Sequence, residues 1–396
     1  MCAEVGRVTM PSGQNYDAIV IGAGVVGACC AHYLAEAGLC VGVVDRGSVA
    51  AGTTGAGEGN ILVSDKEPGA ELDLALLSQR LWTELIDVIG SACELEAKGG
   101  IAVGYDPSTF EHLQQFAAKQ RDSGVIATEV TGGDLLALEP HLNPEVAGAI
   151  YYPQDMQTQP MLAAAHLIAR GVRVGRITLH TNTDVVGIRQ GDGGAVTGVE
   201  TARETLWAPI VVNAAGTWGG QIAAMAGVEV PILPRRGFIL VTEPLPTTVH
   251  RKVYSAQYVA NVASDEASLQ TAAVVEGTES GTILIGASRE RVGFDRTRDW
   301  SIVSTLAAQA LQLFPVLEKV ALMRTYGGFR PYCPDHMPVI GPDARVPGLL
   351  HACGHEGAGV GLAAATGHVI AQSVMGQTTS IDLQPFAAER FGALHV

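Results

Sequence analysis

The first strong hydrophobic pattern in the chain runs from residue 17 to residue 45, DAIVIGAGVVGACCAHYLAEAGLCVGVVD. An apolar run, a glycine turn, a stretch of small apolar residues and a second apolar run predict a strand, a helix and a second strand. In such a unit Gly22 allows a tight turn, Gly24 lets the backbone approach a pyrophosphate, and Gly27 lets the helix pack closely on the sheet. Asp45 ends the second strand, where a carboxylate accepts hydrogen bonds from a ribose. Because the first N–H groups of the helix point at the phosphates, the predicted cofactor contacts are Gly22, Gly24, Val25, Val26, Gly27, Asp45 and Arg46.

The uncharged run at residues 18–31 has a second interpretation, a membrane span. It is too short to cross a bilayer, it contains three glycines, and Asp17 directly precedes it. We therefore expect no membrane span here. The glycine pattern does not distinguish FAD from NAD, so both dinucleotides remain open at this point.

Further along the chain, helical and strand patterns alternate, and apolar strands return as late as residue 353. A cofactor domain whose strands return this late is discontinuous in sequence. The predicted helices are 71–89, 108–123, 159–171 and 301–313, with a small-residue helix after the glycine turn that follows residue 353. The predicted strands are 100–105, a strand near Val125, 178–188, 195–201 after a GDGG turn, an apolar strand in WAPIVVNAAG, a hairpin at 269–293, 338–340 and 348–353.

We predict an α/β fold with two domains. The first is a discontinuous Rossmann-like cofactor domain built from residues 1–90, 151–232 and 322–396. The second is an α+β substrate domain on a mainly antiparallel sheet, built from residues 91–150 and 233–321. No period of 20 to 50 residues recurs, so a repeat architecture is not expected.

A loop of small and hydroxyl-bearing residues, RGSVAAGTTGAGEGNILVSD, follows Asp45. It is too rich in glycine for a regular element, and its hydroxyl and backbone N–H groups suit contact with phosphate or a flat ring. The alternative is a flexible surface loop. Its position directly after the ribose-binding strand favours contact with the cofactor, and the candidate contacts are Thr53, Thr54, Gly59 and Asn60.

Composition narrows the class of protein. The chain has 396 residues, 47% of them hydrophobic, and a net charge of −15, which provides no basic face for nucleic acid or an anionic membrane. Its seven cysteines show no metal-ligand spacing, so no metal site is predicted. The N-terminus has no signal-peptide pattern. We expect a globular cytoplasmic protein.

Five segments, in chain order, carry a resemblance to a known family: GAGVVG with Asp45, VVNAAGTWGG, PRRG, GGFRPYCPDHMPVIG and GHEGAGVGLAAATG. They resemble the D-amino-acid oxidase family of FAD-dependent oxidoreductases, which includes glycine oxidase, sarcosine oxidase and D-amino-acid dehydrogenase. The resemblance extends over nearly the whole chain. The loop GTTGAGEGNILVSD and the hairpin 269–293 look most like the FAD subunits of hetero-oligomeric opine, proline or hydroxyproline dehydrogenases and of hydrogen cyanide synthase.

The resemblance favours FAD over NAD, because a flavin requires a site closed by a late return segment whose helix N-terminus faces the pyrimidine edge of the ring. It implies that the backbone at Val185 and Val186 holds the adenine. It also implies that FAD is bound without a covalent bond, since Gly328 stands where sarcosine oxidases carry the flavin-linked cysteine and Cys333 is out of register. The implied contacts in the return segments are Ala215, Gly216, Trp218, Arg330, Gly354, Glu356, Gly357 and Gly359.

Arg330 is the predicted substrate anchor, because family members bind the substrate carboxylate with an arginine in this GxRP context and a guanidinium fork matches two carboxylate oxygens. A structural ion pair is the alternative. Tyr254 and Tyr258 are weaker catalytic candidates, and His355 and Glu276 are weaker still. Two departures from the family bear on the substrate: Gly361 replaces the sarcosine-type lysine, and Gly357 stands where glycine oxidase has a second arginine.

The resemblance implies an enzyme that dehydrogenates an amino acid or N-substituted amino acid by hydride transfer from Cα to flavin N5, with electrons passing to a partner subunit or a quinone. Three alternatives remain open. The chain could be an oxidase that reduces oxygen to peroxide, a non-catalytic FAD-binding subunit, or an NAD(P) dehydrogenase.

Overall fold

The computed structural model describes residues 14–262 and 264–392. Its six-stranded sheet contains the predicted strand, helix and strand as β2 (Ala18–Ile21), α1 (Val25–Glu36) and β3 (Val41–Val44). The strand order is β19–β20–β13–β2–β3–β9, and every neighbouring pair is parallel except β19 with β20. The remaining strands of this sheet are β9 (Ile177–His180), β13 (Val211–Asn213), β19 (Val339–Pro342) and β20 (Leu349–Cys353).

This sheet is assembled from three distant parts of the chain, which confirms a discontinuous Rossmann-like arrangement. A four-stranded sheet lies beside it in the order β1–β12–β11–β10, with the GDGG turn joining the last two strands. A separate pair, β4 with β8, is antiparallel. The strands are β1 (Gln14–Asn15), β12 (Thr205–Trp207), β11 (Val196–Thr201), β10 (Val185–Gln190), β4 (Asn60–Ile61) and β8 (Met156–Gln157).

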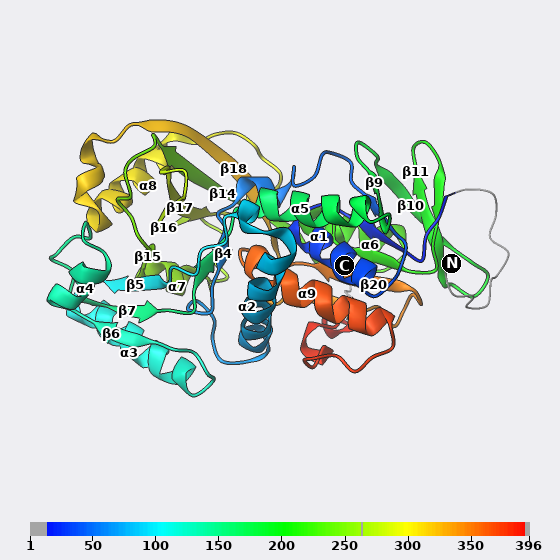
Figure 1. Cartoon of the computed structure of the whole chain (residues 1–396), viewed down its shortest axis with the longest axis horizontal. Helices are drawn as coiled ribbons and strands as arrows, with labels where there is room; N and C mark the ends of the chain where they lie inside the picture. The colour runs from blue at the N-terminus through cyan, green and yellow to red at the C-terminus, as the bar shows by residue number, and fades with distance from the viewer. Residues whose placement is uncertain (1–13, 263, 393–396) are drawn as a thin grey trace.

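An eight-stranded sheet forms the other end of the elongated molecule (Figure 1). It is antiparallel except where β15 runs parallel to β5, so the expected mainly antiparallel second sheet is confirmed. In spatial order its strands are β18 (Leu322–Tyr332), β14 (Leu233–Thr242), β17 (Ile283–Arg289), β16 (Gln270–Gly277), β15 (Lys252–Ser255), β5 (Gly100–Gly104), β7 (Gly148–Tyr152) and β6 (Thr128–Val130).

Two details differ from the sequence-based expectation. β18 pairs with β14 from Leu233 opposite Tyr332 to Thr242 opposite Leu322, so the eight-stranded sheet continues past the expected division between residues 321 and 322. The strand expected near Val125 begins only at Thr128. Val125 is buried in the hydrophobic core, so its apolar character reflects burial and not strand pairing.

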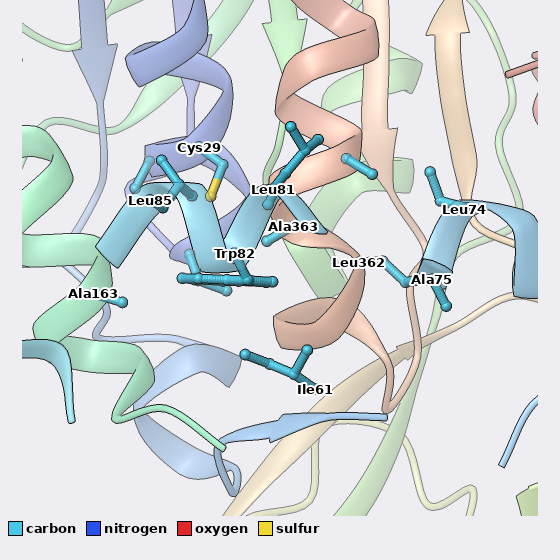
Figure 2. Packing of buried hydrophobic residues seen from close by; sticks show 14 of the residues in the cluster. Cys29, Ile61, Leu74, Ala75, Leu81, Trp82, Leu85, Ala163, Leu362 and Ala363 are labelled. Atoms are coloured by element: carbon cyan, nitrogen blue, oxygen red, sulfur yellow. The ribbon is translucent and has the colours of Figure 1, made fainter. Parts of the chain in front are cut away.

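Helix α2 (Ala70–Ile89) lies across the middle of the molecule and packs on α9 (Gly359–Val374). Figure 2 shows Trp82, Leu81 and Leu85 of α2 among side chains of the neighbouring elements, and the Trp82 indole Nε1 donates a 3.0 Å hydrogen bond to Val360 O. Helix α9 also packs closely on α1. The evidence is that a Cβ added to Gly367 would lie 2.5 Å from the Cys29 carbonyl carbon. The small residues of both helices permit this approach.

The remaining helices cover the sheets. They are α3 (Pro107–Arg121), α4 (Gly132–Leu138), α5 (Pro160–Arg173), α6 (Gly219–Met225), α7 (Ala256–Val262) and α8 (Trp300–Leu313). In the part of the chain that the structure describes, no helix is long and apolar enough to cross a membrane.

Candidate functional site

A cavity of about 1060 Å³ extends from the glycine turn after β2 to the strands β14, β17 and β18 of the second sheet. Its walls come from the N-terminal unit, the segment around residues 214–218, the second sheet, and the turn that opens α9. The volume is at the upper end of ligand pockets, about 300–1,000 Å³. The cavity is therefore large enough for an extended dinucleotide together with a small substrate.

The glycine turn between β2 and α1 is shaped by close backbone contacts. Gly22 has φ +112°, and a Cβ there would lie 2.4 Å from Ala214 O. A Cβ on Gly27 would lie 2.0 Å from Gly22 O, so Gly27 lets the helix approach the turn and does not itself line the cavity. Gly24, Val25 and Val26 do line it. The N-terminus of α1 thus opens onto the cavity, an arrangement suited to phosphate.

Asp45 is fixed at the end of β3. Its Oδ2 accepts from Ala23 N at 2.8 Å and its Oδ1 from Gly47 N at 2.7 Å. Asp45 lines the cavity, as Val185 and Val186 do. This places an acceptor where an adenosine ribose is expected.

The cavity wall near Asp45 also carries a stack of side chains. The Arg46 guanidinium lies 3.8 Å from the centroid of the Trp218 ring, which stacks on Phe294 at 5.3 Å. The predicted contacts Arg46, Trp218, Ala215 and Gly216 all line the cavity. Phe294 was not predicted from sequence, because it comes from a loop of the second sheet and meets Trp218 only in the folded chain.

The loop after Asp45 lies against the cavity, as expected. Thr54 Oγ1 accepts from Val25 N at 3.0 Å, and Thr53 Oγ1 donates to Phe329 O at 2.7 Å, so both hydroxyls hold the loop in place. Asn60 lines the cavity, but Gly59 does not. A Cβ on Gly59 would lie 1.6 Å from Thr158 O, so this glycine serves the contact between β4 and β8.

The turn before α9 closes the far side. Gly357 and Gly359 line the cavity with the N-terminus of this sixteen-residue helix, whose positive end favours negative charge. Gly354 does not line it. This residue has φ +77°, and a Cβ there would meet Ile232 at 2.8 Å, so it serves the turn.

Glu356 lines the cavity but is engaged by neighbouring cations. Its Oε1 pairs with Arg235 Nη1 at 2.6 Å and its Oε2 with His336 Nδ1 at 3.0 Å. Burial opposes its ionisation, but the hydrogen bond to His336 and the charge of Arg235 bring the pKa of Glu356 down to about 2. The carboxylate is therefore ionised, and it forms part of the cavity wall while paired with Arg235 and His336.

Arg330 lies near the end of β18 and lines the cavity. Its Nη1 donates to Ser288 O at 2.8 Å, and its guanidinium fills the space above Gly237, where a Cβ would come within 2.2 Å of Nη1. Gly357 lies on another side of the same side chain. Among the described residues no carboxylate lies within ion-pair distance of Arg330, so the alternative of a structural ion pair finds no partner there.

The other catalytic candidates differ in whether they line the cavity and in what they bond to. Tyr258 lines the cavity, whereas Tyr254 is fully buried behind it, with ring centroids 5.4 Å apart. His355 lines the cavity but bonds to Thr366 at 3.0 Å, and burial lowers its pKa to about 3. Glu276 is buried in an ion pair with Lys252 at 2.8 Å. Of the two tyrosines, Tyr258 is therefore the one that lines the cavity.

Five further cationic residues line the cavity and were not predicted from sequence: Lys66, Arg236, Arg289, Arg296 and Arg298. Lys66 pairs with Asp65 at 2.8 Å and lies 3.7 Å from Glu71. Arg289 ends β17. Lys66 and Arg289 both lie in short runs of charged residues, 65–67 and 289–291, and no local pattern singles them out.

Comparison with known proteins gives consistent results. A family model described as FAD dependent oxidoreductase (DAO) matches residues 17–373. Hydrogen cyanide synthase subunit HcnC from Pseudomonas aeruginosa is 30% identical over 422 residues, covering 96% of this chain and 97% of that protein. Glycine oxidase from Geobacillus kaustophilus is 28% identical over 389 residues, covering 95% and 97%. The crystal structure of glycine oxidase from G. kaustophilus superimposes with a TM-score of 0.86 at 26% identity, covering 96% of this chain and 99% of that chain.

Proposed function

The chain belongs to the DAO family of FAD-dependent oxidoreductases, and we propose that it oxidises the Cα–N bond of an amino acid or N-substituted amino acid. The observation that carries this proposal is Arg330, a cavity-lining guanidinium with no carboxylate partner among the described residues. A planar fork of this kind matches a substrate carboxylate. Glycine oxidase, one of the relatives found, acts on such a carboxylated amine.

The cavity suits FAD at named residues. Asp45 would hold the ribose, the N-terminus of α1 the pyrophosphate, and the N-terminus of α9 the end of the ring that becomes negative on reduction. When bound, FAD supplies a hydride acceptor at its ring N5. Arg330 would hold the substrate carboxylate so that the Cα–H bond faces that acceptor.

The reaction needs little from protein acids or bases. Bound FAD would supply the two-electron acceptor for the Cα–H bond, and the lone pair of a neutral substrate amine would form the C=N bond. The N–H proton would pass to solvent, and water would hydrolyse the imine to an oxo compound and ammonia or an amine, so the chain needs to supply no strong base. Positioning by Arg330 is the main contribution of the chain.

We propose that FAD is held without a covalent bond. Gly328 packs against Ala56, so no thiol stands at the position where sarcosine oxidases carry the flavin-linked cysteine. Cys333 is buried, and its Sγ accepts a hydrogen bond from Arg390 Nη2 at 3.7 Å. Acid precipitation tests this: the flavin should stay in the supernatant, and flavin that precipitates with the protein would refute it.

For the electron acceptor, we propose a partner subunit or a quinone, because the relative HcnC is named as a subunit of a larger synthase. The second candidate is an oxidase that returns electrons to oxygen, as the name glycine oxidase states for another relative. Peroxide release by the isolated chain separates the two. A cytoplasmic location stays a prediction.

The substrate test uses purified holoenzyme under anaerobic conditions. D- and L-amino acids, N-methyl amino acids, prolines and N-carboxyalkyl amino acids are each mixed with the protein, and the loss of flavin absorbance is recorded. Bleaching by at least one of them supports the proposal. A flavin that none of them bleaches indicates a non-catalytic subunit.

A further inference from the structure

Some of the cations that line the cavity have carboxylate partners. Arg236 pairs with Glu290 and with Asp295, each at 2.8 Å. Lys66 pairs with Asp65 at 2.8 Å. Within residues 14–262 and 264–392, two cavity-lining arginines on the strands of the second sheet lack such a partner: Arg330 and Arg289. Arg296 and Arg298 also line the cavity without one, but both are exposed loop residues.

Arg289 is held rigidly in a buried place. Arg289 is the last residue of β17, and it is only 5% exposed. The guanidinium Nη1 donates to Asn261 O at 2.8 Å, and its Cζ lies 5.4 Å from the centroid of the Tyr258 ring. Burial, followed by the nearby charge of Arg330, lowers the pKa of Arg289 to about 10. The group is therefore charged at neutral pH, in a place where its charge is poorly solvated.

The two guanidiniums are neighbours that are held from different sides. Arg330 donates to Ser288 O, the carbonyl directly before Arg289 in the chain. Arg289 in turn is anchored to α7 through Asn261. The charge of Glu356 acts on Arg289, but both carboxylate oxygens of Glu356 are already paired, with Arg235 and His336.

A single substrate carboxylate cannot neutralise the charges of both Arg330 and Arg289. One carboxylate that lies against the fork of Arg330 uses both its oxygens and neutralises one charge. Arg289 would then remain buried without a counter-ion, a costly arrangement in a low-dielectric site. A second anionic group on the ligand removes that cost.

We propose that Arg289 binds a second carboxylate of the substrate, so that this enzyme acts on amino acids that carry two carboxylates, either N-(carboxyalkyl) amino acids or acidic amino acids. Arg330 then binds the carboxylate next to the oxidised carbon, and Arg289 selects for the other. The inference rests on the proposed function and specifies its substrate class.

The test measures binding of ligands that cannot be oxidised, so that it does not depend on turnover. Holoenzyme is titrated with acetate, malonate, succinate and glutarate, and the change in the flavin spectrum gives each Kd. At least one dicarboxylate is expected to bind about tenfold or more tightly than acetate, the effect of about one charge-assisted contact. Equal Kd values for acetate and all three dicarboxylates would overturn the proposal without any variant.

Variants then assign the effect to Arg289. Arg289→Gln should bring the Kd of the best dicarboxylate close to that of acetate, so that the ratio of the two Kd values falls toward one, and Arg289→Lys should keep part of the preference. Arg291→Gln is the matched control, because Arg291 lies two residues further along and bonds to Tyr332 and Asp265 O outside the cavity. An Arg289→Gln protein that loses acetate and dicarboxylate affinity equally would contradict the second-carboxylate role.

Failure of the inference and failure of the proposed function look different. If only the inference fails, monocarboxylic amino acids bleach the flavin as well as dicarboxylic ones do. If the proposed function fails, no amino acid of either kind bleaches the flavin, whatever the Kd values of the dicarboxylates.

Discussion

Arg330 Nη1 donates a 2.8 Å hydrogen bond to Ser288 O, and this bond joins two strands that are not neighbours in the sheet, since β14 lies between β18 and β17. The bond passes over Gly237, where any Cβ would come within 2.2 Å of the guanidinium. A glycine in the central strand thus lets an arginine from β18 cross to β17. The crossing fixes the guanidinium at the wall of the cavity.

The first prediction concerns Arg330 itself. Arg330→Ala should lower kcat/KM for carboxylated substrates by roughly 10- to 100-fold, mainly through KM, because it removes a charge-assisted hydrogen bond of about 1.5–3 kcal/mol. Arg330→Lys should recover only part of this loss, since it keeps the charge but not the fork.

Arg324→Ala serves as the control for that experiment, because Arg324 is an exposed residue of the same strand. Its kinetics should match those of the wild type. If Arg330→Ala kept wild-type kcat and KM, the substrate carboxylate would have to bind elsewhere.

The second prediction concerns Gly27. A Cβ there would lie 2.0 Å from Gly22 O, so Gly27→Ala must push α1 away from the turn. Overpacking of this kind costs about 1–3 kcal/mol. We expect a lower Tm and less FAD per protein molecule.

Gly193→Ala is the control, since no atom of another described residue, its chain neighbours apart, lies within 4 Å of the Cβ that it would add. It should keep wild-type Tm and FAD content. A Gly27→Ala protein with unchanged FAD content and Tm would show that the close contact is not needed.

The third prediction is a pH dependence of stability. Asp155 is 1% exposed, and burial raises its pKa to about 7 although it accepts hydrogen bonds from Ser64 and Val63 N. A carboxyl whose pKa is raised on folding contributes stability that is fully present below its unfolded pKa of about 3.9, and that stability is lost as pH rises through about 7. Asp155→Asn replaces the carboxyl with an amide that does not ionise, so this loss of stability should disappear.

Unfolding of the Asp155→Asn protein is therefore compared with the wild type at pH 5 and at pH 8. The Tm of the variant relative to wild type should be higher at pH 8 than at pH 5. Asp192→Asn, in the exposed hairpin turn, should give no such change. A Tm difference for Asp155→Asn that does not move with pH would contradict the raised pKa.

The sequence predicted the parts of this structure that depend on local pattern. The unit at residues 17–45 appears as β2, α1 and β3, because its apolar runs and glycines fix each element on their own. Arg330 was singled out by its motif, and it lines the cavity. Its role as substrate anchor remains a prediction.

Other features depended on partners far away in the chain. Gly59 and Gly354 look like cofactor glycines, but each is needed for another reason. A Cβ on Gly59 would clash with Thr158, and a Cβ on Gly354 would clash with Ile232. Tyr254 lies on β15, a strand buried on both faces, so alternation could not show which side its ring would take. Arg289 carried no local signal, since its meaning comes from the neighbouring charge of Arg330.

The most direct measurement is the anaerobic half-reaction. Purified holoenzyme is mixed with an excess of an amino acid in the absence of any electron acceptor, and flavin absorbance and the oxo product are both recorded. The proposed function predicts complete bleaching with one oxo product formed for each FAD. A flavin that stays oxidised with every amino acid and N-substituted amino acid, although dithionite bleaches it, would contradict the proposal.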